Sequence, residues 1–342
     1  MALQGHQYEL STLPEVLENL NWWWIAPAVL VEIASYVAFA GIQYQLMKAG
    51  GLRLPRRPLL YVTFAAQAIN NTFPGGPALA AVYGFRWYRR FGANDTLAGW
   101  TLVGTGVTAA VSLALVAAVG VVLASAEGAT LDLIPVVVGV LVVAVGVGVL
   151  FVYERPLVAV LRVTLRAWHG LTGRPRGGIA EVTAKIVDRI TVVRLGWRDI
   201  GATLGWGAAN WLLDCACFVF AFLAIGAGIP WKGLLLAYGA GQLAANLPIT
   251  PGGLGVVEGS ITIALVAFGG NKISTVDAVV IYRLLSFWGE LVIGWFACAY
   301  MALGVRRGRW IRQVRTSPAA ELPPTVPPVA PGRRKNPSGV QV

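Results

Sequence analysis

The sequence predicts an all-α integral membrane protein that crosses the bilayer several times. Hydrophobic residues make up 56% of the 342 residues and charged residues only 13%, whereas an average soluble protein carries about 25% charged residues. The mean hydropathy is +0.66. Several apolar segments also reach the length of about 20 residues that a helix needs to cross a bilayer. The chain is therefore far too apolar for a soluble domain of this size.

The first predicted element, residues 1–21, is an amphipathic leader that lies at the membrane interface. Thr12 stands three residues before Glu15, the spacing of a capping box, and a cluster of three tryptophans begins at Trp22. A disordered polar leader is the alternative. Beyond it, long apolar segments predict membrane-spanning helices at 22–47, 96–125, 131–153, 198–224 and 274–303.

Four shorter apolar segments form two pairs, and each pair is joined by the same tripeptide. Residues 58–73 and 75–90 flank Pro74-Gly75-Gly76, and residues 231–249 and 252–268 flank Pro251-Gly252-Gly253. Since proline and glycine end helices, we expect each pair to be two short helices separated by a break. The pattern leaves open whether these helices cross the bilayer or turn back within it.

The two tripeptides indicate an internal repeat. A shift of 177 positions places Pro74 on Pro251, and the same shift aligns 91–94 (FGAN) with 268–271 (FGGN). The predicted domains are thus a first membrane repeat, 22–125, an extra transmembrane helix in 126–153, and a second membrane repeat, 198–304. Because a broken pair returns to the side it left, the extra helix gives an odd number of crossings between the repeats. We therefore expect the repeats to be inverted relative to each other.

The basic residues predict the orientation. Of the 27 Lys and Arg residues, 24 fall on one predicted side of the membrane, next to the spanning segments. The positive-inside rule then places the N-terminus outside and the C-terminus in the cytoplasm. The net charge of +11 is explained by attraction to anionic inner-leaflet lipid. Nucleic-acid binding is not expected, because the basic residues are not gathered on a separate domain.

Two further segments lie on the predicted cytoplasmic side. Residues 154–197 mix apolar and basic residues at helical spacing, which predicts a cytoplasmic amphipathic insertion. Residues 305–342 form a basic, Pro-rich tail that we expect to be disordered. The sequence has no P-loop motif, so ATP is not expected to drive the protein. Three cysteines and two histidines at scattered positions predict neither a disulfide framework, a metal site nor a cofactor.

The breaks are the predicted functional site. A broken helix exposes unpaired backbone groups, which protein, water or a substrate must satisfy at membrane depth. Glu258 is expected to pair with Arg283, and Glu290 lies seven residues after Arg283, on the same face of an ideal helix. The full set of predicted substrate-binding residues is Asn70, Asn71, Pro74, Gly75, Gly76, Arg86, Gln242, Asn246, Pro251, Gly252, Gly253, Glu258, Arg283 and Glu290.

Structural roles are the alternative for these residues. Glu258, Arg283 and Glu290 can form a buried ion-pair network that only fixes helix packing, and the Asn and Gln residues near the breaks can simply cap helix ends. Glu32 and Asp214 are embedded in predicted spanning helices, and a packing role is as compatible with the sequence as a role in transport. Gln67 also lies near the first break.

Two sequence segments carry a resemblance to a known family. The stretch GQLAANLPITPGGLGVVEG, followed by IYRLLSFWGELVIGW, resembles the lysylphosphatidylglycerol synthase transmembrane region, also called the flippase-like or UPF0104 family. The resemblance covers about 22–304, and the segment NNTFPGGPALAAVYGFRWYRRFGAN is similar to the actinobacterial branch. It implies that the site around Pro251, Gly252, Gly253, Glu258 and Arg283 moves a lipid or a lipid-linked sugar.

The sequence departs from that family at two places. Synthase members carry a soluble acyltransferase domain, whereas only the Pro-rich tail follows Arg315 here, so we do not expect the chain to synthesise lysyl-lipid. Many relatives also have a Gly-Glu pair after the first break, where this chain has Pro77-Ala78-Leu79. A second acidic site at the first break is therefore not expected.

These observations predict a multi-pass plasma-membrane transporter that moves an anionic or polyprenyl-linked lipid between leaflets without ATP. The expected partners are that lipid and anionic inner-leaflet lipid, with a homo-oligomer possible. Two alternatives remain at this point. One is an integral membrane transferase that uses Glu258 or Asp214 as a general base. The other is a scaffold that recruits enzymes of envelope-lipid synthesis.

Overall fold

The computed structural model describes residues 20–126, 195–245 and 251–306, with a few isolated positions between 139 and 148. These residues form helices joined by short turns, and no strand occurs among them. The predictions for the leader, for the extra helix in 126–153, for the insertion 154–197 and for the Pro-rich tail fall almost wholly outside the described residues. The same holds for Asn246.

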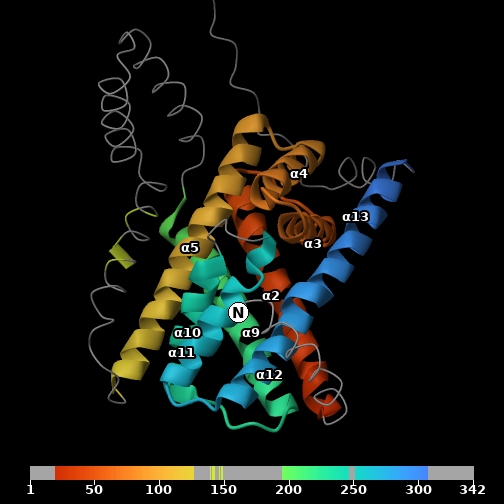
Figure 1. The fold of residues 1–342 in the computed structure, drawn as a ribbon. Coiled ribbons are helices and arrows are strands. Elements are labelled where there is room, and N and C mark those ends of the chain that lie inside the picture. Colours follow the sequence, from red (N-terminus) through yellow and green to blue (C-terminus); the bar gives the residue numbers. More distant parts are fainter. Residues whose placement is uncertain are drawn as a thin grey trace, which may run out of the picture.

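Three helices are long and apolar enough to cross a membrane. They are α2 (Trp22–Ala49), α5 (Asp95–Ala126) and α9 (Trp197–Ala224), and they match the predicted segments 22–47, 96–125 and 198–224. Helices α2 and α9 pack against each other in the centre of the molecule, and α5 lies on the opposite side of this pair from the C-terminal helix α13 (Glu290–Arg306) (Figure 1).

The central pair is antiparallel. Asn21, just before α2, donates its backbone N–H to the carbonyl oxygen of Ala224 at the end of α9, over 2.8 Å. The Asn21 side chain also caps α2, since its oxygen accepts a hydrogen bond of 3.2 Å from the backbone N–H of Trp23. The start of one central helix is therefore fixed to the end of the other.

Both predicted helix breaks are present. Helix α3 (Arg56–Thr72) ends before Pro74, and α4 (Gly76–Arg90) begins after it. At the second break, α10 (Trp231–Ala245) reaches the last described residue before a gap of five, and after this gap the short 3-10 turn η2 (Pro251–Gly253) precedes α11 (Val256–Ala267). Gly75 and Gly252 have φ angles of 72° and 60°, in the left-handed region that glycine adopts most readily. The glycines thus allow the chain to change direction at each break.

The predicted span 274–303 is helical but not uniform. It consists of α12 (Lys272–Arg283), the π-helical segment η3 (Leu284–Gly289) and α13. The side chain of Asn271 caps α12 by accepting hydrogen bonds from the backbone N–H groups of Ile273 and Ser274. The wide π turns change the rotational register between Arg283 and Glu290, which an ideal helix would place on one face.

The helices pack in matching pairs. Helix α3 packs against α13, and α10 packs against α5. Glycine permits both close approaches: a Cβ atom at Gly294 of α13 would lie 2.5 Å from the carbonyl oxygen of Phe64, and one at Gly120 of α5 would lie 2.8 Å from the backbone nitrogen of Leu236. Small residues at such contacts are typical of helix pairs in membranes.

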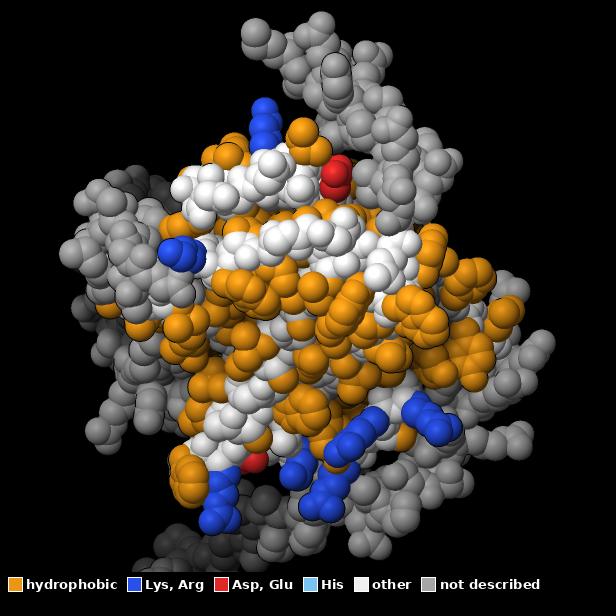
Figure 2. All heavy atoms as spheres, turned by 90° about the horizontal axis from the view of Figure 1, so that it is seen from below, with side chains coloured by type: hydrophobic (Ala, Val, Ile, Leu, Met, Phe, Trp, Pro, Cys, Tyr) orange, Lys and Arg blue, Asp and Glu red, His pale blue; other side chains and the backbone are white. Residues whose placement is uncertain are grey.

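Two large hydrophobic clusters stabilise the two parts of the chain, and a small third one, Phe64, Ala65 and Ala297, joins α3 to α13. One gathers side chains of α2, α3, α4 and α5, with Met301 from α13, and the other gathers mainly side chains of α9 to α12. On the outside, hydrophobic side chains cover the middle of the face in Figure 2, and most Lys and Arg side chains in view lie along one edge of it. An apolar surface with charge at its margin is what a bilayer requires.

Candidate functional site

A cavity of about 440 Å³ lies between the two central helices and the two breaks. Its walls come from α2, α3, α9, α10, α12, η3 and α13, and residues of both breaks line it. The predicted site residues on this lining are Asn70, Asn71, Pro74, Gly75, Gly76, Gln242, Gly252, Arg283 and Glu290. Residues far apart in the sequence thus meet around a single space.

Four other predicted site residues have different positions. Arg86 is exposed on α4 and is not part of the cavity lining. Gly253 and Glu258 do not line the cavity either, although Glu258 contacts a residue that does. Pro251 begins η2.

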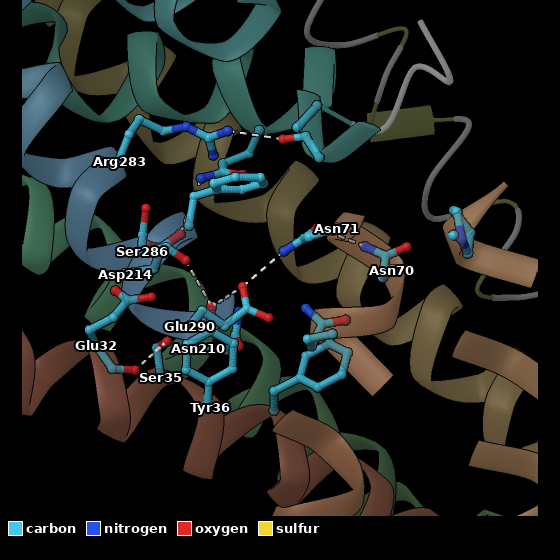
Figure 3. Close-up of a pocket in the computed structure, with 18 of the residues that line it drawn as sticks. Glu32, Ser35, Tyr36, Asn70, Asn71, Asn210, Asp214, Arg283, Ser286 and Glu290 are labelled. Carbon is cyan, nitrogen blue, oxygen red and sulfur yellow. Dashed lines mark hydrogen bonds between the residues drawn. The ribbon is translucent and has the colours of Figure 1, made fainter. Parts of the chain in front are cut away.

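Arg283 connects the second break to α12. Its Nε atom donates a hydrogen bond of 2.6 Å to Oε1 of Glu258, which is the predicted ion pair, and one Nη atom donates to the carbonyl oxygen of Gly252 over 3.0 Å. The guanidinium carbon also lies 4.6 Å from the centre of the Phe287 ring, a cation–π contact. These contacts hold a positive charge at one end of the cavity (Figure 3).

Glu290 contacts the first half of the chain and not Arg283. Its Oε2 atom accepts hydrogen bonds from the hydroxyl of Tyr36, over 2.8 Å, and from the amide of Asn71, over 2.9 Å. The amide of Asn70 in turn donates to the Asn71 side-chain oxygen. The Glu290 side chain is only 3% exposed, so this carboxyl group joins α2, α3 and α13 in the interior.

Asp214 on α9 is the centre of a second polar cluster. Its carboxylate accepts hydrogen bonds from the hydroxyls of Tyr238 (2.6 Å) and Tyr282 (3.0 Å) and from the amide of Gln242 (3.1 Å). Glu32 of α2 lies beside Asp214 in the cavity (Figure 3). The cavity therefore carries carboxyl groups at one end and the Arg283 guanidinium at the other.

The sequence prediction missed several polar residues of the lining. Ser35 and Tyr36 follow Glu32 by three and four positions on α2, and Asn210 precedes Asp214 by four on α9. This spacing places each set on one helix face, so the helical periodicity around each embedded carboxylate was the available signal. Ser286 lies inside the wide turn η3 and precedes Glu290 by four positions, so the same spacing could have identified it. Tyr282, just before this turn, carried no comparable signal.

Comparison with known proteins agrees with this architecture. The family described as the lysylphosphatidylglycerol synthase TM region matches residues 1–294 of the chain. The chain belongs to this family. The match includes both breaks, all residues that line the cavity and the three helices long enough to cross a membrane, so the protein is a membrane protein of the lysylphosphatidylglycerol synthase TM family.

Two curated relatives are UPF0104 membrane proteins of archaea. The protein of Pyrococcus horikoshii is 29% identical over 97 residues, which is 28% of this chain and 29% of the relative. The protein of Methanothermobacter thermautotrophicus is 37% identical over 91 residues, 26% of either chain. The match thus spans less than a third of each relative, and it supports the predicted UPF0104 resemblance.

Proposed function

We propose that this member of the lysylphosphatidylglycerol synthase TM family is a flippase-like transporter that moves a lipid headgroup between the two leaflets without ATP. The observation that carries the proposal is the single cavity formed by both helix breaks. Breaks at membrane depth expose backbone polar groups to a space from which lipid chains are excluded, and such a space suits a polar headgroup. The acyl or polyprenyl chains remain in the bilayer.

The proposal includes two inverted repeats, one with α2 to α5 and one with α9 to α13. The packing supports it, because α3 contacts α13 in the way that α10 contacts α5, and α2 pairs with α9 at the centre. The antiparallel direction of this central pair also fits an inverted relation. Transporters with inverted repeats expose a central site alternately to the two sides by movement of one repeat against the other.

The cavity favours a headgroup with an anionic part. The Arg283 guanidinium lies at one end, and the start of α4 at Gly76 adds the partial positive charge of a helix N-terminus. Gln67, Asn70 and Asn71 of α3 line the cavity, and their amide groups can form hydrogen bonds with hydroxyl or phosphate oxygens. An anionic phospholipid or a polyprenyl-linked sugar phosphate has this combination of groups.

Reconstitution tests the proposal directly. Purified full-length protein in liposomes is supplied with a panel of fluorescent lipids, and the transfer of each lipid between leaflets is measured by quenching from one side. We expect at least one anionic lipid to change leaflet faster than in protein-free liposomes. If every lipid of the panel moves at the protein-free rate, with and without a pH gradient, the transport function is wrong.

A matched pair of variants on α3 links the movement to the cavity. Asn71→Leu removes the amide that bonds to Glu290 and keeps the size of the side chain, so we expect lipid movement to fall about tenfold, as for other polar groups that position a substrate. Arg57→Gln, an exposed position on the same helix and away from the cavity, serves as the control. Equal rates of lipid movement in both variants would contradict the hypothesis that the lipid headgroup passes through the cavity.

A further inference from the structure

The carboxyl groups of Glu32 and Asp214 face each other across the contact between α2 and α9 (Figure 3). Both line the same cavity, close enough for the charge of each group to affect the other. Asp214 already accepts hydrogen bonds from three donors. Glu32 is only 6% exposed, and its Oε2 atom has no hydrogen-bond partner within the described part of the chain. The pair therefore has room for one more hydrogen atom and lacks the donor that would supply it.

A proton is the ligand that fits this position. Two ionised carboxylates in contact repel each other, whereas one shared proton removes a charge and forms a short O–H···O⁻ hydrogen bond. Removal from water makes the second charge still more costly. Among the described residues, no group of three or more His, Cys, Asp or Glu side chains is arranged to hold a metal ion. A metal therefore matches this pair less well than a proton does.

The surroundings of the pair are mostly acidic or neutral. Helix α3 contributes only uncharged amides to the cavity, and α5 contributes no lining residue. Of the described residues that line the cavity, Arg283 alone is basic, and its guanidinium is already paired with Glu258. Among the described residues, the titratable groups close to the pair are Tyr36 of α2, Cys215 and Cys217 of α9, Tyr238 of α10, Tyr282 and Arg283 of α12, and Glu290 of α13. Without a bound proton the pair therefore carries two negative charges, and the hydrogen bonds to Asp214 stabilise only one of them. One bound proton removes the other charge.

We propose that Glu32 and Asp214 form a proton-binding site that couples lipid movement to a pH gradient. This inference rests on the proposed transport function. An anionic headgroup in the cavity raises the free energy of the state in which both carboxyl groups are ionised. Binding of the headgroup therefore favours proton uptake by the pair. By linkage, the bound proton favours the headgroup to the same degree. The proton and the anionic headgroup then cross the membrane together.

Infrared spectroscopy of the purified full chain tests the proton site without transport. A protonated carboxylic acid has a carbonyl stretch, separate from that of a carboxylate, which shifts in heavy water. We expect this band in the native protein at neutral pH and expect Glu32→Gln and Asp214→Asn each to remove a component of it. Asp199→Asn, in the first turn of α9 and away from the cavity, is the control. A native spectrum without the band, or an unchanged band in both variants, overturns the site.

The coupling is tested in proteoliposomes with fluorescent phosphatidylglycerol as the anionic lipid. We expect a pH gradient, acidic on the side of the labelled leaflet, to increase the rate about tenfold, the usual range for coupling between two sites. Glu32→Gln, a fixed neutral form of the acid, should lose this dependence. If the native protein moves the lipid at the same rate with and without the pH gradient, the coupling is wrong and the transport function still stands. If no lipid moves although the band depends on Glu32, the transport function fails, and with it the coupling, while the proton site itself stands.

Discussion

Arg283 shows how a single side chain fixes one end of the cavity. Its guanidinium contacts the Glu258 carboxylate on α11, the carbonyl oxygen of Gly252 at the second break and the ring of Phe287 in the wide turn. Arginine suits this position because its planar group can bond in several directions and stack on a ring at the same time. Three segments that meet at the break thus depend on one residue.

Loss of this residue is expected to destabilise the protein. In Arg283→Gln, the Glu258 carboxylate, whose side chain is 23% exposed, loses its positively charged partner, and we expect the free energy of unfolding to fall by about 2–4 kcal/mol. The double variant with Glu258→Gln should lose less than the sum of the two single variants, because no unpaired charge remains. Unfolding midpoints in detergent measure each step of the cycle.

The pair of Arg89 and Asp95 provides the control. Its side chains are 43% and 75% exposed, so water already solvates both charges, and Arg89→Gln should cost at most about 1 kcal/mol. A loss of the same size at both arginines would show that the Arg283 contacts do not hold the second break together.

At the scale of the elements, the first break depends on two adjacent glycines for different reasons. Gly75 has a φ angle of 72° and open space around its Cα atom, so only backbone strain opposes a side chain there. Gly76 is buried at the start of α4, where a Cβ atom would overlap the carbonyl oxygen of Asn70. The end of α3 and the start of α4 are therefore in backbone contact.

The two glycines should respond differently to alanine. Gly75→Ala should cost about 1 kcal/mol of stability, the strain of a left-handed alanine, and leave lipid movement nearly unchanged. Gly76→Ala should push Asn70 and Asn71 out of position and lower the transport rate more strongly. Unfolding midpoints and lipid movement in liposomes, measured on both variants, check this order, and the reverse order would contradict the geometry of the break.

The contact between α3 and α13 also depends on a glycine. A Cβ atom at Gly294 would lie 2.5 Å from the carbonyl oxygen of Phe64, so Gly294→Ala should force the helices apart and cost about 1–3 kcal/mol. Gly106→Ala, at an exposed position of α5 where an added Cβ atom would contact no described residue outside the adjacent helix turns, should instead be neutral or stabilising by up to about 1 kcal/mol. Thermal unfolding of both variants in detergent tests this contrast.

At the scale of the whole molecule, the distribution of charge predicts the orientation in the membrane. The basic residues predict that Arg57 faces the cytoplasm and Lys232 the outside. Both side chains are exposed in the structure. Each can therefore be replaced by cysteine and tested for access from either side.

Cysteine labelling from one side of the membrane tests this predicted orientation. In a variant without Cys215, Cys217 and Cys298, an impermeant maleimide added to intact cells should label Lys232→Cys at once, and should label Arg57→Cys only after the membrane is opened. Labelling of Arg57→Cys in intact cells would reverse the orientation. Labelling of both positions from one side would contradict the inverted arrangement of the two repeats.

Much of this architecture follows from local sequence rules. Long apolar runs predicted the three spanning helices, and the repeated tripeptide predicted the breaks, because proline and glycine act on the backbone nearby. The cavity lining was harder. Tyr36 and Tyr282 belong to apolar helices, and their hydroxyl groups become important only when a carboxylate from another helix comes close. Arg86 shows the opposite error, since a charge near a break in the sequence can still point away from it.

The wide turns of η3 set the angular phase between α12 and α13. Along an ideal α-helix each residue advances the direction of the side chain by about 100°. Deletion of one residue from Leu284–Gly289 would let the segment revert to α-helix and turn all of α13 by roughly this angle relative to α12. Glu290 would then point away from Tyr36, and Gly294 would no longer face α3. The one additional residue in η3 therefore allows α13 to make both its contact with Tyr36 and its contact with α3.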